Sequence, residues 1–150
     1  MSGKYEYSVQ NWYHGMSPRE CRVWTAFIQK FPDRFDSVDY NVRVGSGSIA
    51  PEPFEQQYPG LWKLLTQKRI DAVGWNEDIP TIVEVKDEAR STALGELITY
   101  STLYKETFSI NFDVPLLLVC VLVDPDLVSL FAERNVEVVE VEADLRGLRV

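Results

Sequence analysis

Apolar residues recur along the chain with two periods, one typical of helices and one typical of strands. Helical spacing predicts long helices over residues 17–31 and about 90–108. Apolar runs of strand length predict strands at 35–44, 69–75, 80–86, 115–123 and 136–141, and a short helix is expected at 127–134. This order of elements predicts one α/β domain in which helices flank a central mixed sheet.

The remaining segments have weaker patterns. Residues 1–16 are rich in aromatic side chains and are expected to pack on the body of the protein. Residues 49–68 contain three prolines and a glycine, which predicts a long loop with a short helix at 61–66. We therefore divide the domain into an aromatic extension (1–16), a core (17–123) and a C-terminal helix and strand (124–150).

The first helix has clear start and stop signals. Ser17 is suited to the N-cap, Pro18 to the first helical position and Glu20 to the third position of a capping box. Pro32 ends the apolar pattern of this helix.

Three charged residues interrupt the two central strands. Asp71 lies in the first strand, and Glu84 and Lys86 lie in the second, after a turn at residues 76–78. Charged groups in buried strands are costly unless they are paired or bind a metal. Because side chains alternate along a strand, Glu84 and Lys86 share one face. If the hairpin pairs in register, Asp71 lies close to Glu84, and this makes a functional site the leading hypothesis.

Two adjacent carboxylates repel each other unless a proton or a hard cation lies between them. Oxygen ligands of this kind suit Mg²⁺ or Mn²⁺. A lysine two residues further along can neutralise developing charge or orient an attacking water. The pattern Asp71, then Glu84-Val85-Lys86, therefore favours metal-assisted hydrolysis.

At these residues the chain resembles the PD-(D/E)XK nuclease superfamily, whose signature is an Asp on one strand and Glu-x-Lys on the next. The resemblance covers residues 17–123 and implies an αβββαβ restriction-endonuclease-like core. It also implies a Mg²⁺-dependent (or Mn²⁺-dependent) nuclease that hydrolyses phosphodiester bonds in duplex, branched or single-stranded DNA. Asp71, Glu84 and the carbonyl of Val85 would then hold the metal, and Lys86 would position water or neutralise charge. The small size is similar to that of junction-resolving and phage-type members, which often act as homodimers.

Two further positions match patterns of that superfamily. Its first helix often contributes a glutamate to the metal site, and Glu20 occupies a comparable place, although capping explains Glu20 equally well. Its second helix often carries Gln-x-x-x-Tyr, which here reads Glu96 to Tyr100 with glutamate in place of glutamine. Residues i and i+4 share one helical face, so both side chains are expected to point at the cleft.

Charge changes this picture in two ways. The net charge of −8 argues against binding nucleic acid over the whole surface. It is unevenly spread, however, because residues 1–35 carry five basic and three acidic residues, whereas residues 113–150 carry three basic and eight acidic residues. The candidates for nucleic-acid contact are Arg19 and Arg22 on the first helix and Lys63, Lys68 and Arg69 just before Asp71.

Cysteine content and hydropathy bear on the compartment. Cys21 and Cys120 fall in a predicted helix and a predicted core strand, which favours reduced, buried thiols over a disulfide. No apolar run approaches the ~20 residues that span a bilayer, and no secretory pattern opens the chain. We expect a cytoplasmic protein, and the resemblance adds that it could be phage-encoded.

Two alternatives remain open. The chain could have kept a nuclease fold without activity and serve as an assembly or protein-interaction module, which the acidic surface, the glutamate at 96 and the aromatic N-terminus favour. It could also be a plain α/β domain in which Glu84 and Lys86 form a surface pair on an edge strand.

Overall fold

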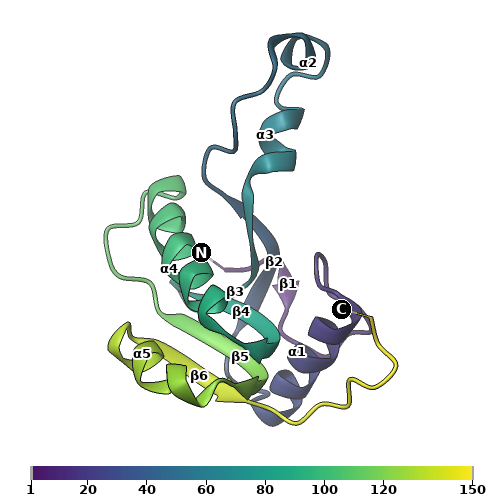
Figure 1. The fold of residues 1–150 in the computed structure, drawn as a ribbon, viewed down its shortest axis with the longest axis vertical. Coiled ribbons are helices and arrows are strands. Elements are labelled where there is room, and N and C mark those ends of the chain that lie inside the picture. The colour runs from purple at the N-terminus through teal and green to yellow at the C-terminus, as the bar shows by residue number, and fades with distance from the viewer. Residues whose placement is uncertain (1, 150) are drawn as a thin grey trace.

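A computed structural model of the chain describes residues 2–149 and shows a six-stranded mixed sheet flanked by helices (Figure 1). The order in the sheet follows the order in the chain. Strands β1 to β4 pair antiparallel, and β4, β5 and β6 pair parallel. The strands are β1 (Tyr5–Glu6), β2 (Ser37–Val44), β3 (Lys68–Asn76), β4 (Ile79–Ala89), β5 (Leu116–Val123) and β6 (Val136–Glu140). The predicted fold class, α/β with a central mixed sheet, is confirmed.

Two long helices cover opposite faces of this sheet. Helix α1 (Pro18–Lys30) buries Val23, Trp24 and Phe27 against one face. Helix α4 (Ser91–Thr107) buries Ala93 and Leu97 against the other. Short elements η1 (Pro125–Leu127) and α5 (Val128–Glu133) join β5 to β6, and Phe131 of α5 packs in the α4 cluster. Burying apolar side chains on both faces explains why β4 and β5 read as continuous apolar runs.

The start of α1 follows its sequence signals. Ser17 is the N-cap, its Oγ accepts a hydrogen bond from the Glu20 amide at 3.2 Å, and Pro18 opens the helix. The helix ends at Lys30, before Pro32. The predicted boundaries of this helix are therefore confirmed.

Residues 45–67 form an arm that projects from the sheet between β2 and β3 (Figure 1). It carries two short helices, α2 (Glu52–Gln57) and α3 (Leu61–Thr66), neither of which has a buried residue. The helix at 61–66 was predicted, whereas α2 falls in a segment predicted as loop. Prolines at the start of a helix do not break it, and Pro51 and Pro53 stand at the N-cap and within the first turn of α2.

The N-terminal extension packs on the body, as expected. Tyr7 and Tyr13 are buried in the α1 cluster, and the two-residue strand β1, which was not predicted, pairs with β2. Cys21 and Cys120 are both free and buried. Among residues 2–149 there is no helix with the length and apolar character needed to cross a bilayer.

The feature that positions the site is a separation of two central strands. Pairing between β3 and β4 runs from Asn76↔Ile79 to Ala72↔Val83 and ends there. Beyond this point β3 continues with β2 into the arm, and β4 continues with β5. We call this point the fork. Asp71 and Glu84 are the first residues beyond it.

Candidate active site at the strand fork

Asp71 takes the place of the missing backbone pairing at the fork. Its Oδ2 accepts a hydrogen bond from the Val85 amide at 2.9 Å. In a strand, the N–H and C=O of one residue point to the same side. The Val85 carbonyl is therefore also directed toward the side of β3, where the regular ladder has ended. A carboxylate and a backbone carbonyl consequently lie on the same side of β4.

Glu84 is buried, with 3 % of its surface exposed. Its Oε1 lies 3.6 Å from Lys86 Nζ, and its Oε2 is buried with no hydrogen-bond partner among residues 2–149. Glu84 and Asp71 contact each other through their side chains. Burial and the neighbouring Asp71 carboxylate raise the pKa of Glu84 well above its usual value. Of the two acids, Glu84 is therefore the one whose protonated form the fold favours more strongly.

Asp71 responds to the same surroundings more weakly. Burial raises its pKa, while the contact with Glu84 and the Val85 amide act in the opposite direction. The hydrogen bond from the Val85 amide explains why the pKa of Asp71 is raised less than that of Glu84.

Lys86 connects the acid pair to helix α4. Its Nζ lies 3.2 Å from Oε2 of Glu96 and 3.3 Å from Oε1 of the same carboxylate. Burial lowers the pKa of Lys86, but Glu84 and Glu96 together outweigh burial and the net shift is upward. Lys86 is thus a cation at neutral pH, which suits it to neutralise charge or orient water and not to accept a proton.

Tyr100 lies one turn after Glu96 on α4. Burial, followed by the charges of Glu84, Glu96 and Asp71, raises the pKa of Tyr100 and keeps it protonated. The structure thus places Glu96 and Tyr100 on the same side of α4, facing the fork, as the i, i+4 spacing predicts.

Glu20 approaches the site from the other helix. Burial and the nearby Asp71 raise its pKa, whereas hydrogen bonds to the side chain and backbone of Ser17 lower it. Both sequence-based interpretations of Glu20 therefore have a physical counterpart. Glu20 stands at the third position of the N-cap motif, where its amide donates to Ser17 Oγ, and its carboxylate lies near enough to Asp71 for the two charges to interact.

The oxygen atoms at the fork are of the kind that Mg²⁺ binds. No three His, Cys, Asp or Glu side chains within residues 2–149 converge into a complete metal cage. Mg²⁺ does not need one, because it keeps several waters and binds through one or two carboxylates together with substrate phosphates. Asp71, Glu84 and the Val85 carbonyl supply such a partial set. The orphaned Oε2 of Glu84 is a buried oxygen that a cation would satisfy.

A comparison of the chain with protein-family models, curated proteins and solved structures finds no match. The interpretation of the site therefore depends on its geometry. That geometry excludes one alternative: β4 lies between β3 and β5, and Glu84 is buried. Glu84 and Lys86 are not a surface pair on an edge strand.

The two candidate arginines on α1 already have protein partners. Arg19 pairs with Asp87 at 3.0 Å and donates to the Leu148 carbonyl, and Arg22 donates to the Asp144 carbonyl at 3.5 Å. These contacts occupy part of the donor capacity that a phosphate would need.

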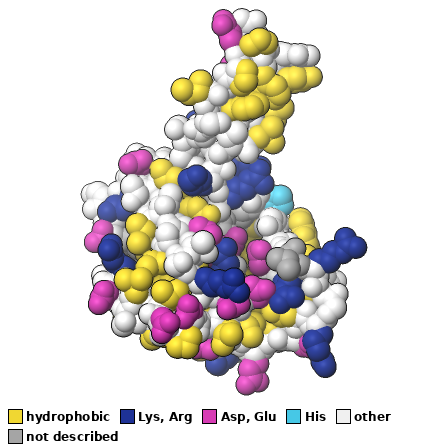
Figure 2. Space-filling model, in the orientation of Figure 1, with side chains coloured by type: hydrophobic (Ala, Val, Ile, Leu, Met, Phe, Trp, Pro, Cys, Tyr) yellow, Lys and Arg dark blue, Asp and Glu magenta, His cyan; other side chains and the backbone are white. Residues whose placement is uncertain are grey.

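The basic residues at the foot of the arm are differently placed. Within residues 2–149, Lys63, Lys68 and Arg69 form no ion pair. Arg69 lies directly opposite Arg43 in the β2–β3 register, and like charges in such positions repel. Figure 2 shows Lys and Arg side chains gathered where the arm meets the body. Arg43 was not predicted as a contact, because its position opposite Arg69 emerges only from the pairing of β2 with β3.

Proposed function

We propose that this protein is a metal-dependent nuclease that hydrolyses phosphodiester bonds in DNA. The observation that carries the proposal is the acid pair at the fork. Asp71 and Glu84 are in contact, one buried Glu84 oxygen has no donor, and a charged lysine lies 3.6 Å from the other. Such an arrangement is unfavourable for folding alone and favourable for holding a hard cation.

Each residue then has a defined part. Asp71, Glu84 and the Val85 carbonyl would hold Mg²⁺ or Mn²⁺, which when bound lowers the pKa of a water and stabilises charge on the phosphate. Lys86 stays protonated, so it orients the attacking water or offsets the growing negative charge of the transition state. Glu96 holds Lys86 in place from α4 through the 3.2 Å ion pair, and Tyr100 lies one helical turn after Glu96, where its hydroxyl can contact the substrate.

Substrate contact is best supported at the foot of the arm. Lys68 and Arg69 precede Asp71 by three and two residues on the same strand. At about 3.3 Å per residue they lie roughly 7–10 Å from it along the strand. Arg43 faces Arg69 across the register. A phosphate backbone between these cations would relieve their mutual repulsion and bring the next phosphates toward the fork.

A cleavage assay tests the proposal. Supercoiled, linear and branched DNA are incubated with the protein in Mg²⁺, in Mn²⁺ or in EDTA. Cleavage is expected with metal and not with EDTA, and Lys86→Met is expected to fold but to cleave much more slowly than the wild type. Lys105→Met is the matched control, because Lys105 pairs with exposed Asp113, outside the fork. Absence of cleavage on all three substrates, with a metal titration heat unchanged by Asp71→Asn, would overturn the nuclease proposal.

A second candidate function is an assembly or interaction module, favoured by the arm. Ile49 on the arm is 96 % exposed, and Leu61, Leu64 and Leu65 of α3 are exposed as well. Figure 2 shows these hydrophobic side chains gathered over the arm, and such patches are typical of interaction sites. Light scattering of the wild type and of a Leu64→Ser, Leu65→Ser variant decides whether the arm mediates self-association. This outcome is independent of cleavage.

A further inference from the structure

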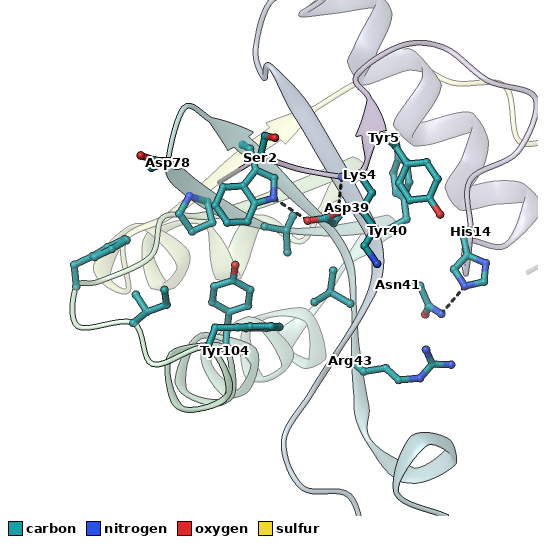
Figure 3. Close-up of a pocket in the computed structure, with 17 residues that line it drawn as sticks. Ser2, Lys4, Tyr5, His14, Asp39, Tyr40, Asn41, Arg43, Asp78 and Tyr104 are labelled. Carbon is teal, nitrogen blue, oxygen red and sulfur yellow. Dashed lines mark hydrogen bonds between the residues drawn. The ribbon is translucent and has the colours of Figure 1, made fainter. Parts of the chain in front are cut away.

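A second hollow lies away from the fork. It has a volume of about 840 Å³ and is formed by the N-terminal segment, β2, the end of β3, the C-terminal half of α4 and residues 108–112 (Figure 3). None of the fork residues Asp71, Glu84 and Lys86 lines it. Its volume falls within the ~300–1,000 Å³ of ordinary ligand sites. We call it the aromatic pocket.

One end of the aromatic pocket has flat, apolar walls. Trp75 and Tyr104 are largely buried, and Phe108 and Phe112 stand at the rim with 44 % and 40 % exposure. The exposed rings of Phe108 and Phe112 can stack on a planar ring, and stacking on a nucleobase contributes about 1–3 kcal/mol per base.

The aromatic end of the pocket also presents polar atoms to a ligand. Tyr104 is only 4 % exposed, yet its hydroxyl has no hydrogen-bond partner among residues 2–149 and points into the hollow in Figure 3. Asp39 lies beside it, held by the Trp75 indole N–H at 2.9 Å and by the Lys4 amide at 2.8 Å. A carboxylate oxygen can accept more than one hydrogen bond. This end is therefore equipped for a planar ring that carries N–H donors and acceptors.

The other end of the aromatic pocket is basic. Lys4 and Arg43 line it, and neither forms an ion pair with any residue from 2 to 149. Arg43 donates through Nε to the Leu64 carbonyl at 3.3 Å, which leaves its terminal nitrogens for a ligand. His14 and Asn41 bond to each other on the same side, and Figure 3 shows all four labelled side chains away from Tyr104. Cations with free donors suit a phosphate.

We propose that the aromatic pocket binds one nucleotide unit, with the base at the end lined by Tyr104, Phe108 and Phe112 and the phosphate at Lys4 and Arg43. The polarity of the hollow carries this assignment, because a ring with hydrogen-bonding edges fits one end and an anion fits the other. The nucleotide can be a free mononucleotide or an unpaired nucleotide of a strand. The proposal stands on this pocket alone and does not require the fork to cleave DNA.

Calorimetry on the full chain in EDTA tests the proposal with four probes: deoxyadenosine monophosphate, deoxyadenosine, deoxyribose 5-phosphate and a four-residue deoxyadenosine oligonucleotide. The monophosphate is expected to bind about tenfold more tightly than either fragment, a difference of ~1.4 kcal/mol. A free-nucleotide site binds the monophosphate at least as well as the oligonucleotide, whereas a strand site prefers the oligonucleotide.

Variants separate the two ends. Tyr104→Phe removes a hydroxyl without a partner, so the fold is retained, and it should weaken the monophosphate and deoxyadenosine by the same factor. Lys4→Gln with Arg43→Gln should abolish the advantage of the monophosphate over deoxyadenosine. Arg134→Gln, on the connection after α5, is the control and should change nothing. The proposal would be overturned if neither the monophosphate nor the oligonucleotide binds at millimolar concentration. It would also be overturned if both bind but the variants leave their affinities unchanged.

Discussion

The Val85 amide donates a 2.9 Å hydrogen bond to Asp71 Oδ2, across the point where β3 and β4 stop pairing. Asp71 thus has both a structural role and a chemical role. Its carboxylate replaces a backbone acceptor, and the same bond fixes it beside the buried Glu84. The fold itself therefore holds Asp71 at the fork.

Two substitutions of Asp71 separate its structural role from its chemical role. Asp71→Asn keeps an acceptor for the Val85 amide, so the free energy of unfolding should change little, while metal binding and cleavage are lost. Asp71→Ala leaves that amide without a partner and should cost an additional 1–3 kcal/mol or so. Urea denaturation in EDTA and metal calorimetry measure the two effects. Equal unfolding free energies for both variants would show that the hydrogen bond does not stabilise the fork.

Glu84→Gln should change how stability depends on pH. Burial and Asp71 raise the pKa of Glu84 in the folded protein above its usual value of 4.5. The folded state therefore binds more protons than the unfolded state between those two pKa values, and stability falls as the pH rises through that window. In EDTA, the Glu84→Gln substitution should flatten this decline. At pH values above the folded-state pKa of Glu84, the variant should be more stable than the wild type. Urea denaturation across the pH range measures these slopes, with exposed Glu133→Gln as the control. Parallel plots of unfolding free energy against pH for the wild type and Glu84→Gln would refute the raised pKa of Glu84.

Metal binding should release a proton. Glu84 carries a proton below its raised pKa, and ligands must be deprotonated before they bind metal. At a pH below the raised pKa of Glu84, the heat of Mg²⁺ or Mn²⁺ binding should depend on the ionisation enthalpy of the buffer. Titrations in two buffers at one pH give the number of protons released. Glu84→Gln should remove the buffer dependence, and a wild type without it would contradict the location of the proton.

Lys86 should act by its charge. Lys86→Met is expected to lower the single-turnover cleavage rate by about 10²–10³-fold, the usual effect of losing one preorganised group that stabilises charge. It should also raise the pKa of Glu84 further, because the 3.6 Å counter-ion is lost. Lys86→Arg keeps the charge and should retain more activity than Lys86→Met. Equal rates for the two variants would argue against an electrostatic role.

The cations at the foot of the arm should govern the salt dependence of DNA binding. Lys68→Gln and Arg69→Gln should each reduce the slope of log affinity against log salt by about 0.9, the value for one phosphate contact on duplex DNA. Arg69→Gln should also stabilise the free protein slightly, because it removes a like-charge pair with Arg43. Fluorescence anisotropy over a salt series measures the slopes, with Arg134→Gln as the control. Slopes that stay at the wild-type value would place the DNA elsewhere.

The sequence predicted the central features because they depend on local periods. Strand alternation placed Glu84 and Lys86 on one face, and a hairpin with a turn at 76–78 brought Asp71 close to Glu84 on the condition that the strands pair in register. The helical i, i+4 spacing aligned Glu96 with Tyr100. These side-chain arrangements follow from the spacing of residues within a single strand, hairpin or helix, and do not depend on how the helices pack on the sheet.

Other features depend on packing between distant segments. The pairing of Lys86 with Glu96 requires α4 to dock on β4, and the buried, partnerless oxygen of Glu84 is visible only once the chain is folded. The aromatic pocket joins residues from Lys4 to Phe112, and no single stretch of sequence carries a signal for it. Strand β1 is two residues long, too short for alternation to be visible.

The geometry at the base of the arm has a practical consequence for engineering. Val44 and Lys68 are direct partners in the β2–β3 ladder, so the chain leaves the body and returns to it at the same place. Residues 45–67 can therefore be exchanged for a two-residue Asn-Gly turn that closes the hairpin. The body would keep its buried clusters, and the segment becomes a cassette into which other recognition elements can be grafted.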